Sequence, residues 1–423
     1  MLKNMLFNSS NTGERYGGTW VATIGTNSYD TPGSVAVAPD GYIYFTGSAN
    51  GPILVKYDKS GKIIWSKFSD GISIGLGGIG MDNNGYIYTA GTPGLRLFKF
   101  DKSGENLIWQ RNLFYDVSGC WSYGSDVSVA GDGSVYVCGG HELPVSLSTA
   151  NDAMLVKYNS SGTLQWQRRM YYKPYQSQDS SEYATSVAAA HDGSVYVCSS
   201  QSLNGVLIKY NSSGTIQWQR FVVKCGPACV IVSSDGYIYT TYTDNDYCTI
   251  ITKYNSSGTL QWLRRLYNCP GASYGRASIT EGPDGFLYVC CTTSVPGILI
   301  AKFNSSGTLQ WQRTLGLDRN SCGGSGISVS PDGSVYICGY TYGLLNGPDL
   351  IISRITNEVI SATENDQVMF GNFTIKKSTL TYDAKEPTFA DVNLSYTTGS
   401  MKTSSDTITF TNGLGGAETH LYT

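Results

Sequence analysis

The segment Asp132-Gly-Ser-Val-Tyr136 is followed by Val156-Lys-Tyr-Asn-Ser-Ser-Gly-Thr-Leu-Gln-Trp166, and these two motifs decide the fold. Asp-Gly between apolar runs is a strong signal for a β-hairpin, because both turn residues tolerate positive φ. The second motif places Asn three residues before Gly, which suits a turn closed by hydrogen bonds to the Asn side chain. Together the motifs predict two successive hairpins, whose four strands we name a, b, c and d in chain order.

Both motifs recur along the chain. The first occurs seven times, at steps of 43 to 60 residues, and its copies begin at Asp40, Asn84, Asp132, Asp192, Asp235, Asp284 and Asp332. The second follows the first six copies and each time ends in a tryptophan: Trp65, Trp109, Trp166, Trp218, Trp262 and Trp311. About 45 residues and four strands per unit are typical of a β-propeller blade.

The seventh copy lacks its Trp strand, because no Trp follows residues 349–355. The segment Gly18-Thr-Trp20-Val-Ala-Thr-Ile-Gly25 precedes the first unit and resembles the missing strand d. We therefore predict an all-β chain with a seven-bladed propeller over residues 18–355, preceded by a short lead of residues 1–17. The N-terminal strand closes blade 7 and so removes the open sheet edges that invite aggregation.

The tail, residues 356–423, differs from the blades because it has no Cys and no Trp and is dense in Thr and Ser. Three triplets echo at a spacing of fourteen residues: Leu380-Thr-Tyr382, Leu394-Ser-Tyr396 and Ile408-Thr-Phe410. Each alternates apolar and polar residues and is a predicted strand. Their few large side chains cannot order the tail alone, so either it packs on the propeller or strands of several chains join. We favour the second arrangement, which makes the tail an attachment and oligomerisation segment.

Composition excludes several classes of function. The chain of 423 residues carries a net charge of −3 and only 14% charged residues, with no basic run, so we expect no nucleic-acid partner. No apolar run approaches the roughly 18 residues that span a bilayer, so we expect no membrane insertion. The first residues, Met1-Leu-Lys-Asn-Met-Leu-Phe7, contain no apolar region of signal-peptide length. We therefore expect folding in a cytoplasm.

The cysteines indicate packing rather than cross-linking. Four of the eleven, Cys138, Cys198, Cys290 and Cys338, occupy one repeated position, and Thr46, Ala90 and Thr241 fill the same position in other repeats. A position that accepts Cys, Thr or Ala is a small packing site. We therefore predict reduced, structural thiols.

The sequence offers few catalytic groups. Its three histidines, His141, His191 and His420, fall on different parts of the predicted fold, so we expect neither a metal site nor a triad. Only Asp126 and Glu281 stand near the predicted inner strands, where a glycosidase propeller would need paired carboxylates. We predict no catalytic residues and no cofactor.

Two further motifs receive structural interpretations. Gly75-Leu-Gly-Gly-Ile-Gly80 matches a dinucleotide-binding pattern, but a hairpin turn follows it instead of a helix, which favours a narrow inner strand. Thr243-Asp-Asn-Asp246 is an acidic loop that is either simply solvated or in contact with a cation.

The most variable loops suggest a binding surface. Propeller connectivity places the a–b and c–d turns on one face and the b–c and d–a loops on the other, and here only the second set varies much in length. The long loops around blades 3 and 4 carry the aromatic residues Trp121, Tyr123, Tyr171, Tyr172 and Tyr175. Tyr and Trp combine a rigid contact area with a polar group, which suits glycan or protein binding. The alternative is that these side chains pack the loops against one another.

The unit Tyr57-Asp-Lys-Ser-Gly-Lys-Ile-Ile-Trp65 resembles the tryptophan motif of quinoprotein-like propellers. The full blade is similar to bacterial β-propeller-repeat families, and above all to propeller proteins encoded among the structural genes of tailed phages. Quinoprotein dehydrogenases carry eight blades and a vicinal disulfide. Here Cys290 fills the packing position and points away from Cys291, so we do not expect that activity.

The phage resemblance implies a non-enzymatic virion protein of the tail, fibre or baseplate. Its expected partners are other virion proteins and a host-surface glycan or protein. Two alternatives stay open at this point: an extracellular bacterial adhesin or lectin, and a glycan-degrading enzyme.

Overall fold

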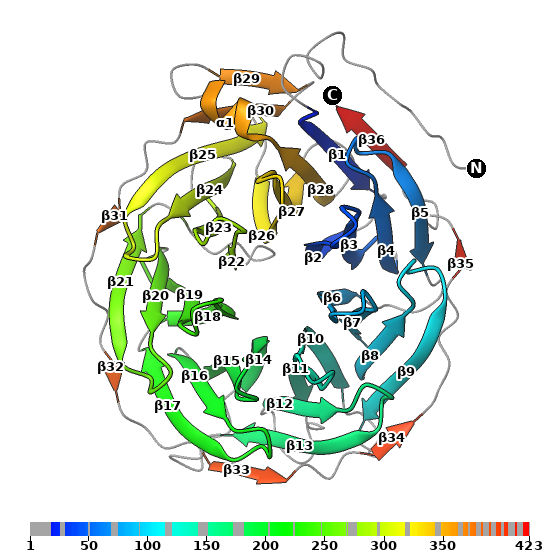
Figure 1. The fold of residues 1–423 in the computed structure, drawn as a ribbon, viewed down its shortest axis with the longest axis vertical. Helices are drawn as coiled ribbons and strands as arrows, with labels where there is room; N and C mark the ends of the chain where they lie inside the picture. The colour runs from blue at the N-terminus through cyan, green and yellow to red at the C-terminus, as the bar shows by residue number, and fades with distance from the viewer. Residues whose placement is uncertain are drawn as a thin grey trace.

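The repeated motifs form seven antiparallel sheets arranged in a ring, as Figure 1 shows for the computed structural model. The structure describes residues 18–422 apart from short gaps, which are residues 26–29, 50, 69–74, 93, 115–120, 143–150, 172–181, 202–203, 223–224, 247, 268, 270–276, 294–296, 318–321, 343–347, 363–366, 371–372, 378–381, 384–388, 391–394, 399–401, 405–410 and 413–417. Within these residues each blade contributes the four predicted strands, so the predicted seven-bladed β-propeller is confirmed.

Strand a of every blade lies nearest the centre of the ring and strand d lies outside. The strands of blades 1 to 3 are β2 (Thr31–Val37), β3 (Ile43–Ser48), β4 (Pro52–Tyr57), β5 (Ile63–Phe68); β6 (Leu76–Met81), β7 (Ile87–Gly91), β8 (Leu95–Phe100), β9 (Leu107–Phe114); and β10 (Trp121–Val129), β11 (Val135–Glu142), β12 (Asn151–Tyr158), β13 (Leu164–Tyr171). Those of blades 4 to 6 are β14 (Glu182–Ala189), β15 (Val195–Gln201), β16 (Asn204–Tyr210), β17 (Ile216–Val222); β18 (Cys225–Val232), β19 (Ile238–Asp244), β20 (Thr249–Tyr254), β21 (Leu260–Leu266); and β22 (Ser278–Glu281), β23 (Leu287–Thr292), β24 (Ile298–Phe303), β25 (Leu309–Leu317).

Blade 7 joins the two ends of the ring. It consists of β26 (Cys322–Val329), β27 (Val335–Tyr342), β28 (Pro348–Ile355) and the N-terminal β1 (Trp20–Gly25). β1 runs antiparallel to β28, with Trp20 opposite Arg354 and Ile24 opposite Leu350. The predicted closure by the N-terminal strand is therefore confirmed.

Local turn chemistry explains why the hairpins form. In blade 3 the Asp132 carboxylate accepts hydrogen bonds from the backbone N–H and the hydroxyl of Ser134, and Gly133 takes a φ of 79°. In the c–d turn the Asn159 side-chain oxygen accepts three hydrogen bonds, from the Ser161 N–H, the Ser161 hydroxyl and the Thr163 N–H. Each motif thus closes its own turn through local hydrogen bonds.

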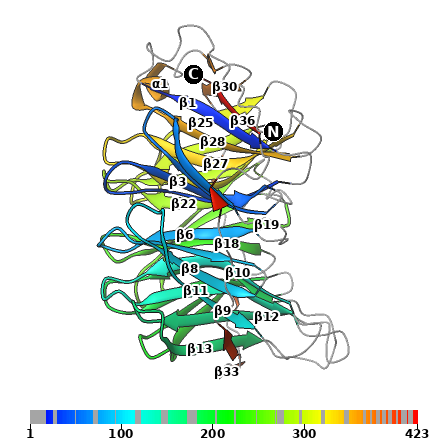
Figure 2. The same ribbon diagram turned by 90° about the vertical axis from the view of Figure 1, so that its right-hand side faces the viewer.

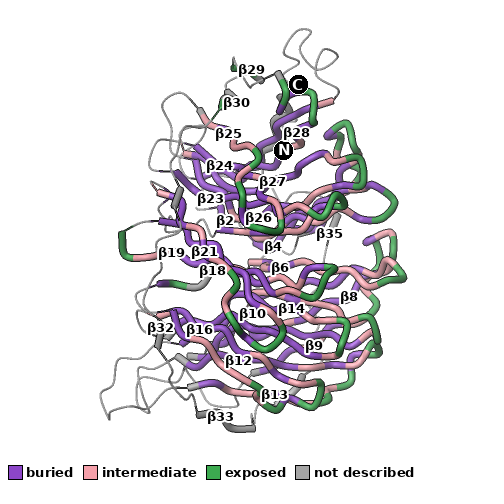
Figure 3. Tube along the Cα trace, turned by 60° about the vertical axis from the view of Figure 1, so that its left-hand side comes forward, coloured by how far each residue is buried: buried purple, intermediate pink, exposed green. Residues whose placement is uncertain are grey.

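The hydrophobic core lies between neighbouring blades rather than at the centre of the ring. Cys138 of blade 3 shares one buried cluster with Val187 and Val197 of blade 4. Because each blade is covered by a neighbour on both sides, its strands are apolar on both faces, and buried residues follow the strands in Figure 3 while exposed residues gather in the turns. The four cysteines of the repeated position are all fully buried, each in a different blade.

The tail adds an outer layer to the ring. After the short helix α1 (Asn357–Ala362), β29 (Gln367–Phe370) and β30 (Phe373–Lys377) form a hairpin on β25 of blade 6. Short strands then pair with the outer strands of blades 5, 4, 3, 2, 1 and 7 in turn: β31 (Tyr382–Asp383), β32 (Phe389–Ala390), β33 (Ser395–Thr398), β34 (Lys402–Ser404), β35 (Thr411–Asn412) and β36 (Glu418–Tyr422). We call residues 367–422 the belt; its orange-to-red strands encircle the ring in Figure 1.

The belt advances one blade for every seven residues along most of its length. In blades 6 to 2, the fourth residue after the blade Trp pairs with one residue of the belt. In order from blade 6 to blade 2, these belt residues are Ile375, Tyr382, Phe389, Tyr396 and Thr403. Seven extended residues reach at most about 23–25 Å, so this period leaves enough chain to pair briefly and then cross to the next blade. The fourteen-residue echo in the sequence is therefore every second contact of a seven-residue period, with Tyr382 on blade 5 and Tyr396 on blade 3.

This arrangement differs from the one that the sequence analysis favours, in which strands of several chains complete the tail. In the structure the strands β30 to β36 pair with blades of their own chain. The physical reason is the outer edge of each blade, which presents unpaired N–H and C=O groups within reach of the same polypeptide. The few apolar side chains of the tail need not form a core, because the tail extends sheets that already exist.

The seam at blade 7 gives the first prediction. Trp20 is 1% exposed and its indole Nε1 donates to the Lys59 carbonyl oxygen (3.0 Å), whereas Trp218 is only half-buried at the corresponding place in blade 4. We expect Trp20→Ala to lower the free energy of unfolding by about 3–5 kcal/mol, at least as much as Trp218→Ala. The exposed Ile64 is the control, because Ile64→Ala should change stability by less than about 0.5 kcal/mol. Chemical denaturation measures all three; an unchanged Trp20→Ala variant would show that β1 does not close the ring.

The end of the belt gives the second prediction. β36 covers the edge of β1 that β28 leaves free, with Val21 opposite Tyr422 and Gly25 opposite Glu418. A chain that ends at Asn412 lacks β36, so the β1 amides that point toward it should exchange hydrogen faster with solvent. β17 provides the internal control, because β32 still covers it and its exchange should not change. Equal exchange of β1 in the full-length and shortened chains would contradict this pairing.

Candidate functional site

The ring has two chemically different faces. The a–b and c–d hairpin turns lie on one face, which we call the turn face, and the connections between b and c and between d and the next a lie on the other, the loop face (Figure 2). On the turn face seven similar units stand side by side. On the loop face the strands of blades 3 and 4 end next to the longest connections.

Each c–d turn is bound by the preceding blade, in an arrangement that we call the clasp. The indole Nε1 of the strand-d Trp donates to a carbonyl oxygen in the next turn: Trp20 to Lys59, Trp65 to Ser103, Trp166 to Ser212, Trp218 to Ser256 and Trp262 to Ser305, at 2.9–3.2 Å. The strand-c lysine reaches the same oxygen in several blades; Lys157 Nζ, for example, lies 3.2 Å from the Ser212 oxygen. The blade 3 turn is the exception: Trp109 Nε1 is buried without a hydrogen-bond partner among the described residues, and the turn is instead bound by Lys99 Nζ and Arg111 Nε, which donate to the Ser160 and Gly162 carbonyl oxygens (3.1 and 2.6 Å).

An arginine completes the clasp. Arg168 Nε donates to the Gly214 carbonyl oxygen (2.6 Å) while its guanidinium lies over the Trp166 ring, 5.1 Å from the centroid. Gly214 has a φ of 78°, and a Cβ there would lie 2.8 Å from the Arg168 guanidinium. The repeated Gly, Trp and Arg are thus explained by blade-to-blade contacts, and this surface is largely structural.

Helix α1 takes the place of the missing c–d turn in blade 7. Arg313 Nε donates a hydrogen bond to the Ile360 carbonyl oxygen (3.1 Å). Val359 and Ile360 pack in the same hydrophobic cluster as Trp311. This helix is not predictable from the sequence, because six residues with one acidic side chain give no clear periodic signal.

The two inner-strand carboxylates join blades. Asp126 of blade 3 accepts hydrogen bonds from the Ser186 hydroxyl (2.8 Å) and the Val187 N–H (3.1 Å) of blade 4. Glu281 of blade 6 accepts from the N–H (2.7 Å) and hydroxyl (3.0 Å) of Ser234 in blade 5. Both carboxylates therefore hold neighbouring blades together.

A buried polar row crosses blade 3 at its loop-face end. The Ser122 hydroxyl and His141 Nδ1 are 2.9 Å apart, His141 stands opposite Asp152 in the sheet, and the Arg169 guanidinium forms an ion pair with the Asp152 carboxylate. His141 is fully buried and Ser122 nearly so, which leaves the hydroxyl inaccessible to a substrate. The row therefore fixes the strand ends instead of forming a nucleophilic triad.

The aromatic residues predicted for binding divide into three groups. Trp121 is the first residue of β10 and Tyr171 the last of β13, so both stand where the strands of blade 3 meet the loop face. Tyr123 is half-buried, and its ring lies so close to Gly140 that a Cβ there would be 2.4 Å from the Tyr123 hydroxyl. Tyr172 and Tyr175 lie outside the described residues. Tyr123 is thus at least partly a packing residue.

The other motifs also have partners within the fold. Gly75–Gly80 runs into the inner strand β6, where a Cβ on Gly78 would lie 2.0 Å from an Asp126 carboxylate oxygen, so close packing explains the glycines. In the acidic loop, Asp244 and Asp246 each form an ion pair with the Arg265 guanidinium, at 2.6 and 2.7 Å. The cation at this loop is a side chain of the protein.

Ten of the cysteines lie in the described part of the chain, and all ten are free thiols. Burial raises the pKa of the Cys290 thiol well above its ordinary value, and it does the same for Cys198. A buried, protonated thiol is a poor nucleophile and a poor metal ligand. Cys120 is outside the described residues.

Two features are absent from the part of the chain that the structure describes. Among the residues that the structure describes, no three His, Cys, Asp or Glu residues are grouped so that they could hold a metal ion. No helix in the described ranges is long and apolar enough to cross a membrane.

The repeat pattern matches one known family over part of the chain. Residues 151–350 match the PQQ_2 family, described as outer membrane protein assembly factor BamB. The match covers slightly less than half of the chain. The match runs from strand c of blade 3 into strand c of blade 7, and it agrees with the resemblance to quinoprotein-like repeats.

Solved structures resemble the ring only loosely. The propeller of Dos1 aligns with a TM-score of 0.48 and 13% identity, covering 78% of this chain and 80% of that one. A luciferin-regenerating enzyme aligns at 0.42 and 12%, covering 67% and 91%, and a protein of unknown function from Bacteroides caccae at 0.41 and 12%, covering 70% and 93%. No curated protein matches the chain. These similarities carry no conclusion about activity.

A carboxylate at the seam gives a prediction for pH. Burial disfavours the charged form of Asp332, but hydrogen bonds from Ser330 and Ser334 and the charge of Arg354 outweigh burial and lower its pKa to about 2. A carboxyl whose pKa falls on folding contributes stability above its unfolded pKa of about 4, and that contribution disappears as the pH falls toward 2. Asp332→Asn should therefore be less stable than the parent at pH 6, and the difference should shrink at pH 2.5. Urea unfolding at both pH values measures it, and a pH-independent difference would contradict the assignment.

Proposed function

We propose that the protein is a non-enzymatic structural and binding component of a tailed-phage virion, in the tail, fibre or baseplate. It folds in the host cytoplasm and joins the particle as several copies, which associate through residues 356–423 at the rim of the ring. Its partners are other virion proteins and a host-surface glycan or protein. The resemblance of the blades to propellers encoded among phage structural genes supplies the particle assignment.

The observation that carries this proposal is the continuous belt. One segment pairs with the outer strand of all seven blades and ends on the seam strand β1. A blade cannot detach without also breaking its belt strand, so the belt should slow unfolding. Slow unfolding benefits a protein that must survive outside a cell, where it is not replaced.

The use of the polar side chains favours binding over catalysis. Asp126 and Glu281 hold neighbouring blades together, and Ser122 and His141 are buried against each other. The charged side chains of the clasp likewise point into contacts between blades. These polar and charged side chains therefore stabilise the propeller as a rigid scaffold.

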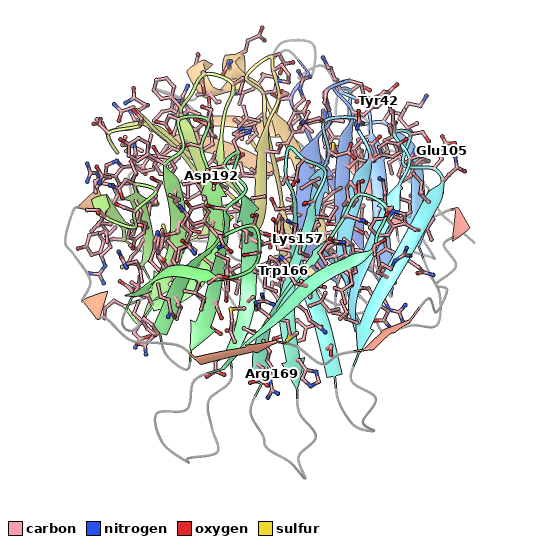
Figure 4. All side chains as sticks on the ribbon, turned by 60° about the horizontal axis from the view of Figure 1, so that its bottom comes forward. Tyr42, Glu105, Lys157, Trp166, Arg169 and Asp192 are labelled. Carbon is pink, nitrogen blue, oxygen red and sulfur yellow. The ribbon has the colours of Figure 1, made fainter. Side chains whose placement is uncertain are left out.

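The loop face of blade 3 is the binding surface that we favour. Trp121 and Tyr171 stand at strand ends that the Ser122–His141 hydrogen bond and the Arg169–Asp152 ion pair hold in place. Figure 4 shows Arg169 at one end of blade 3, with Tyr42 and Glu105 toward the opposite face of the ring. Rigid strand ends lower the entropic cost of binding through the aromatic groups next to them.

Mass spectrometry of purified particles tests the assignment to a virion. We expect the chain to be present at several copies per particle and to stay bound after washing in high salt. Its absence from particles together with its presence on a bacterial surface would favour an adhesin or lectin instead. Release of reducing ends from host polysaccharide by the purified protein would identify a glycan-degrading enzyme.

The loop-face site is tested by substitution. Trp121→Ala combined with Tyr171→Ala should weaken attachment to host cells by at least about thirtyfold, since binding hot spots contribute about 2 kcal/mol or more. Glu105→Gln on the turn face is the control and should bind normally. Normal attachment of the double variant, with an unchanged melting temperature, would place the binding surface elsewhere.

A further inference from the structure

A recess lies on the turn face, opposite the loop face, between blades 2 and 3. It has a volume of about 390 Å³, at the lower end of the range for small-molecule sites. Its walls come from three turns: the a–b turns of both blades and the c–d turn of blade 3. We call it the notch. Turns of this kind recur around the ring, so we compare the residues of the notch with those at the same turn positions of other blades.

One of these positions lacks a side chain in blade 3. Blades 1, 3 and 4 share one a–b sequence, Ala-x-Asp-Gly, in which x is Pro39, Gly131 and His191. Gly131 has no heavy atom within 4 Å of the place where its Cβ would lie. Its φ is not among the positive values found for the turn glycines that follow Asp or Asn, so the backbone does not demand glycine here. Gly131 lines the notch, and its empty side-chain position leaves open space there.

Blade 2 adds a carboxylate at a turn position where no other blade has one. Its a–b turn reads Asp82-Asn-Asn-Gly85, with a carboxylate where blades 1, 3 and 4 have Ala. One Asp82 oxygen accepts from the N–H groups of Asn84 and Tyr86, at 2.9 and 3.0 Å, and the other from the Tyr88 hydroxyl at 3.2 Å. A carboxylate has about four acceptor positions, so Asp82 retains capacity for a ligand.

The other walls combine donors and acceptors. Lys99 Nζ donates to the Ser160 carbonyl oxygen (3.1 Å) and lies 4.4 Å from the centre of the Tyr86 ring, which leaves N–H groups for a further partner. Asp132 accepts only from Ser134 among the described bonds, and hydrogen bonds from Ser134 outweigh burial and lower the pKa of its carboxyl, so it is an acceptor at neutral pH. The exposed Ser160 and Ser161 add hydroxyls.

This chemistry selects the class of ligand. An anion would meet the carboxylates of Asp82 and Asp132, a metal ion would meet the Lys99 ammonium, and an apolar ligand would bury these polar groups without partners. A neutral polyhydroxylated ring can donate to the carboxylates and accept from Lys99 and the Asn83 amide at once. The volume is suited to one or two such rings. We propose that the notch binds a sugar residue of a glycan.

This site is separate from the loop-face surface, and it does not depend on the chain being a virion protein. A glycan held on the turn face would leave the loop face free for a protein partner. The clasp residues Lys99 and Ser160 also place the notch on a rigid junction between two blades, which suits a preformed site.

The test fills the notch with a residue that the fold already accepts elsewhere. Gly131→Pro introduces the residue found at Pro39 in the same sequence frame, and the described hydrogen bonds of the turn do not use the Gly131 N–H. His191→Pro makes the same change in the matching turn of blade 4 and serves as the control. Gly131→Ser is a second filling variant in case proline disturbs folding.

Saturation-transfer NMR with the methyl glycosides of glucose, galactose, N-acetylglucosamine and rhamnose, at millimolar concentration, reads out binding. We expect transfer from at least one glycoside to the parent protein and to His191→Pro, and at least tenfold weaker binding to both Gly131 variants at unchanged melting temperature. Failure of all four glycosides with the parent, or undiminished binding to the Gly131 variants, would overturn the proposal. The virion assignment is read from particle composition, so either proposal can fail without the other.

Discussion

The ring depends on one strand, β1, which is paired along both of its edges. β28 lies on one side, with Trp20 opposite Arg354, and β36 lies on the other, with Val21 opposite Tyr422. The N-terminal segment, the last propeller strand and the end of the belt therefore meet in one sheet. The ring of seven blades is closed only as long as this sheet is intact, because the sheet joins the N-terminal strand to the C-terminal strands.

The clasp explains why the blades are so similar. In the Asn-Ser-Ser-Gly turn, the Asn side chain accepts hydrogen bonds from the turn's own backbone, as Asn159 does in blade 3. Carbonyl oxygens of the same turns accept hydrogen bonds from the preceding blade, as Gly162 does from an Arg and Ser212 from a Trp. A residue that serves both its own turn and a neighbour cannot change freely. Positions that vary among the turns, such as Gly131, do not have to serve both their own turn and a neighbouring blade. We therefore infer that binding takes place there and on the loop face.

The sequence predicts the blades well because their signals are local. Asp-Gly and Asn-Ser-Ser-Gly encode turns within a few residues, and the unpaired Trp20 strand reveals the closure. The belt could not be predicted in the same way, since strands of two to four residues such as β31 and β35 are too short to show an alternating pattern. An apolar-x-aromatic triplet occurs only at every second blade that the belt contacts. The sequence therefore shows a fourteen-residue spacing instead of the seven-residue period.

Contacts that depend on register were likewise beyond the sequence. Ser122 and His141 are nineteen residues apart and meet only because β10 and β11 pair with Ser122 opposite His141. The notch is lined by turns of two neighbouring blades. The significance of Gly131 therefore depends on how these turns are arranged in space, which the sequence does not show. Of the predicted binding residues, the structure places Trp121 and Tyr171 at strand ends and shows that Tyr123 packs on Gly140.

A disulfide placed at the seam tests the account most directly. Thr23 and His420 are directly opposite each other in β1 and β36, and paired residues of antiparallel strands have Cβ atoms about 4.5–5.5 Å apart, close enough for a cysteine bridge after a small adjustment. The double variant Thr23→Cys with His420→Cys, oxidised in dilute solution and examined by non-reducing electrophoresis and peptide mass spectrometry, should form the bridge within one chain and give no disulfide-linked dimer. Bridging only between two chains, or no bridge at all, would contradict a belt that returns to its own propeller.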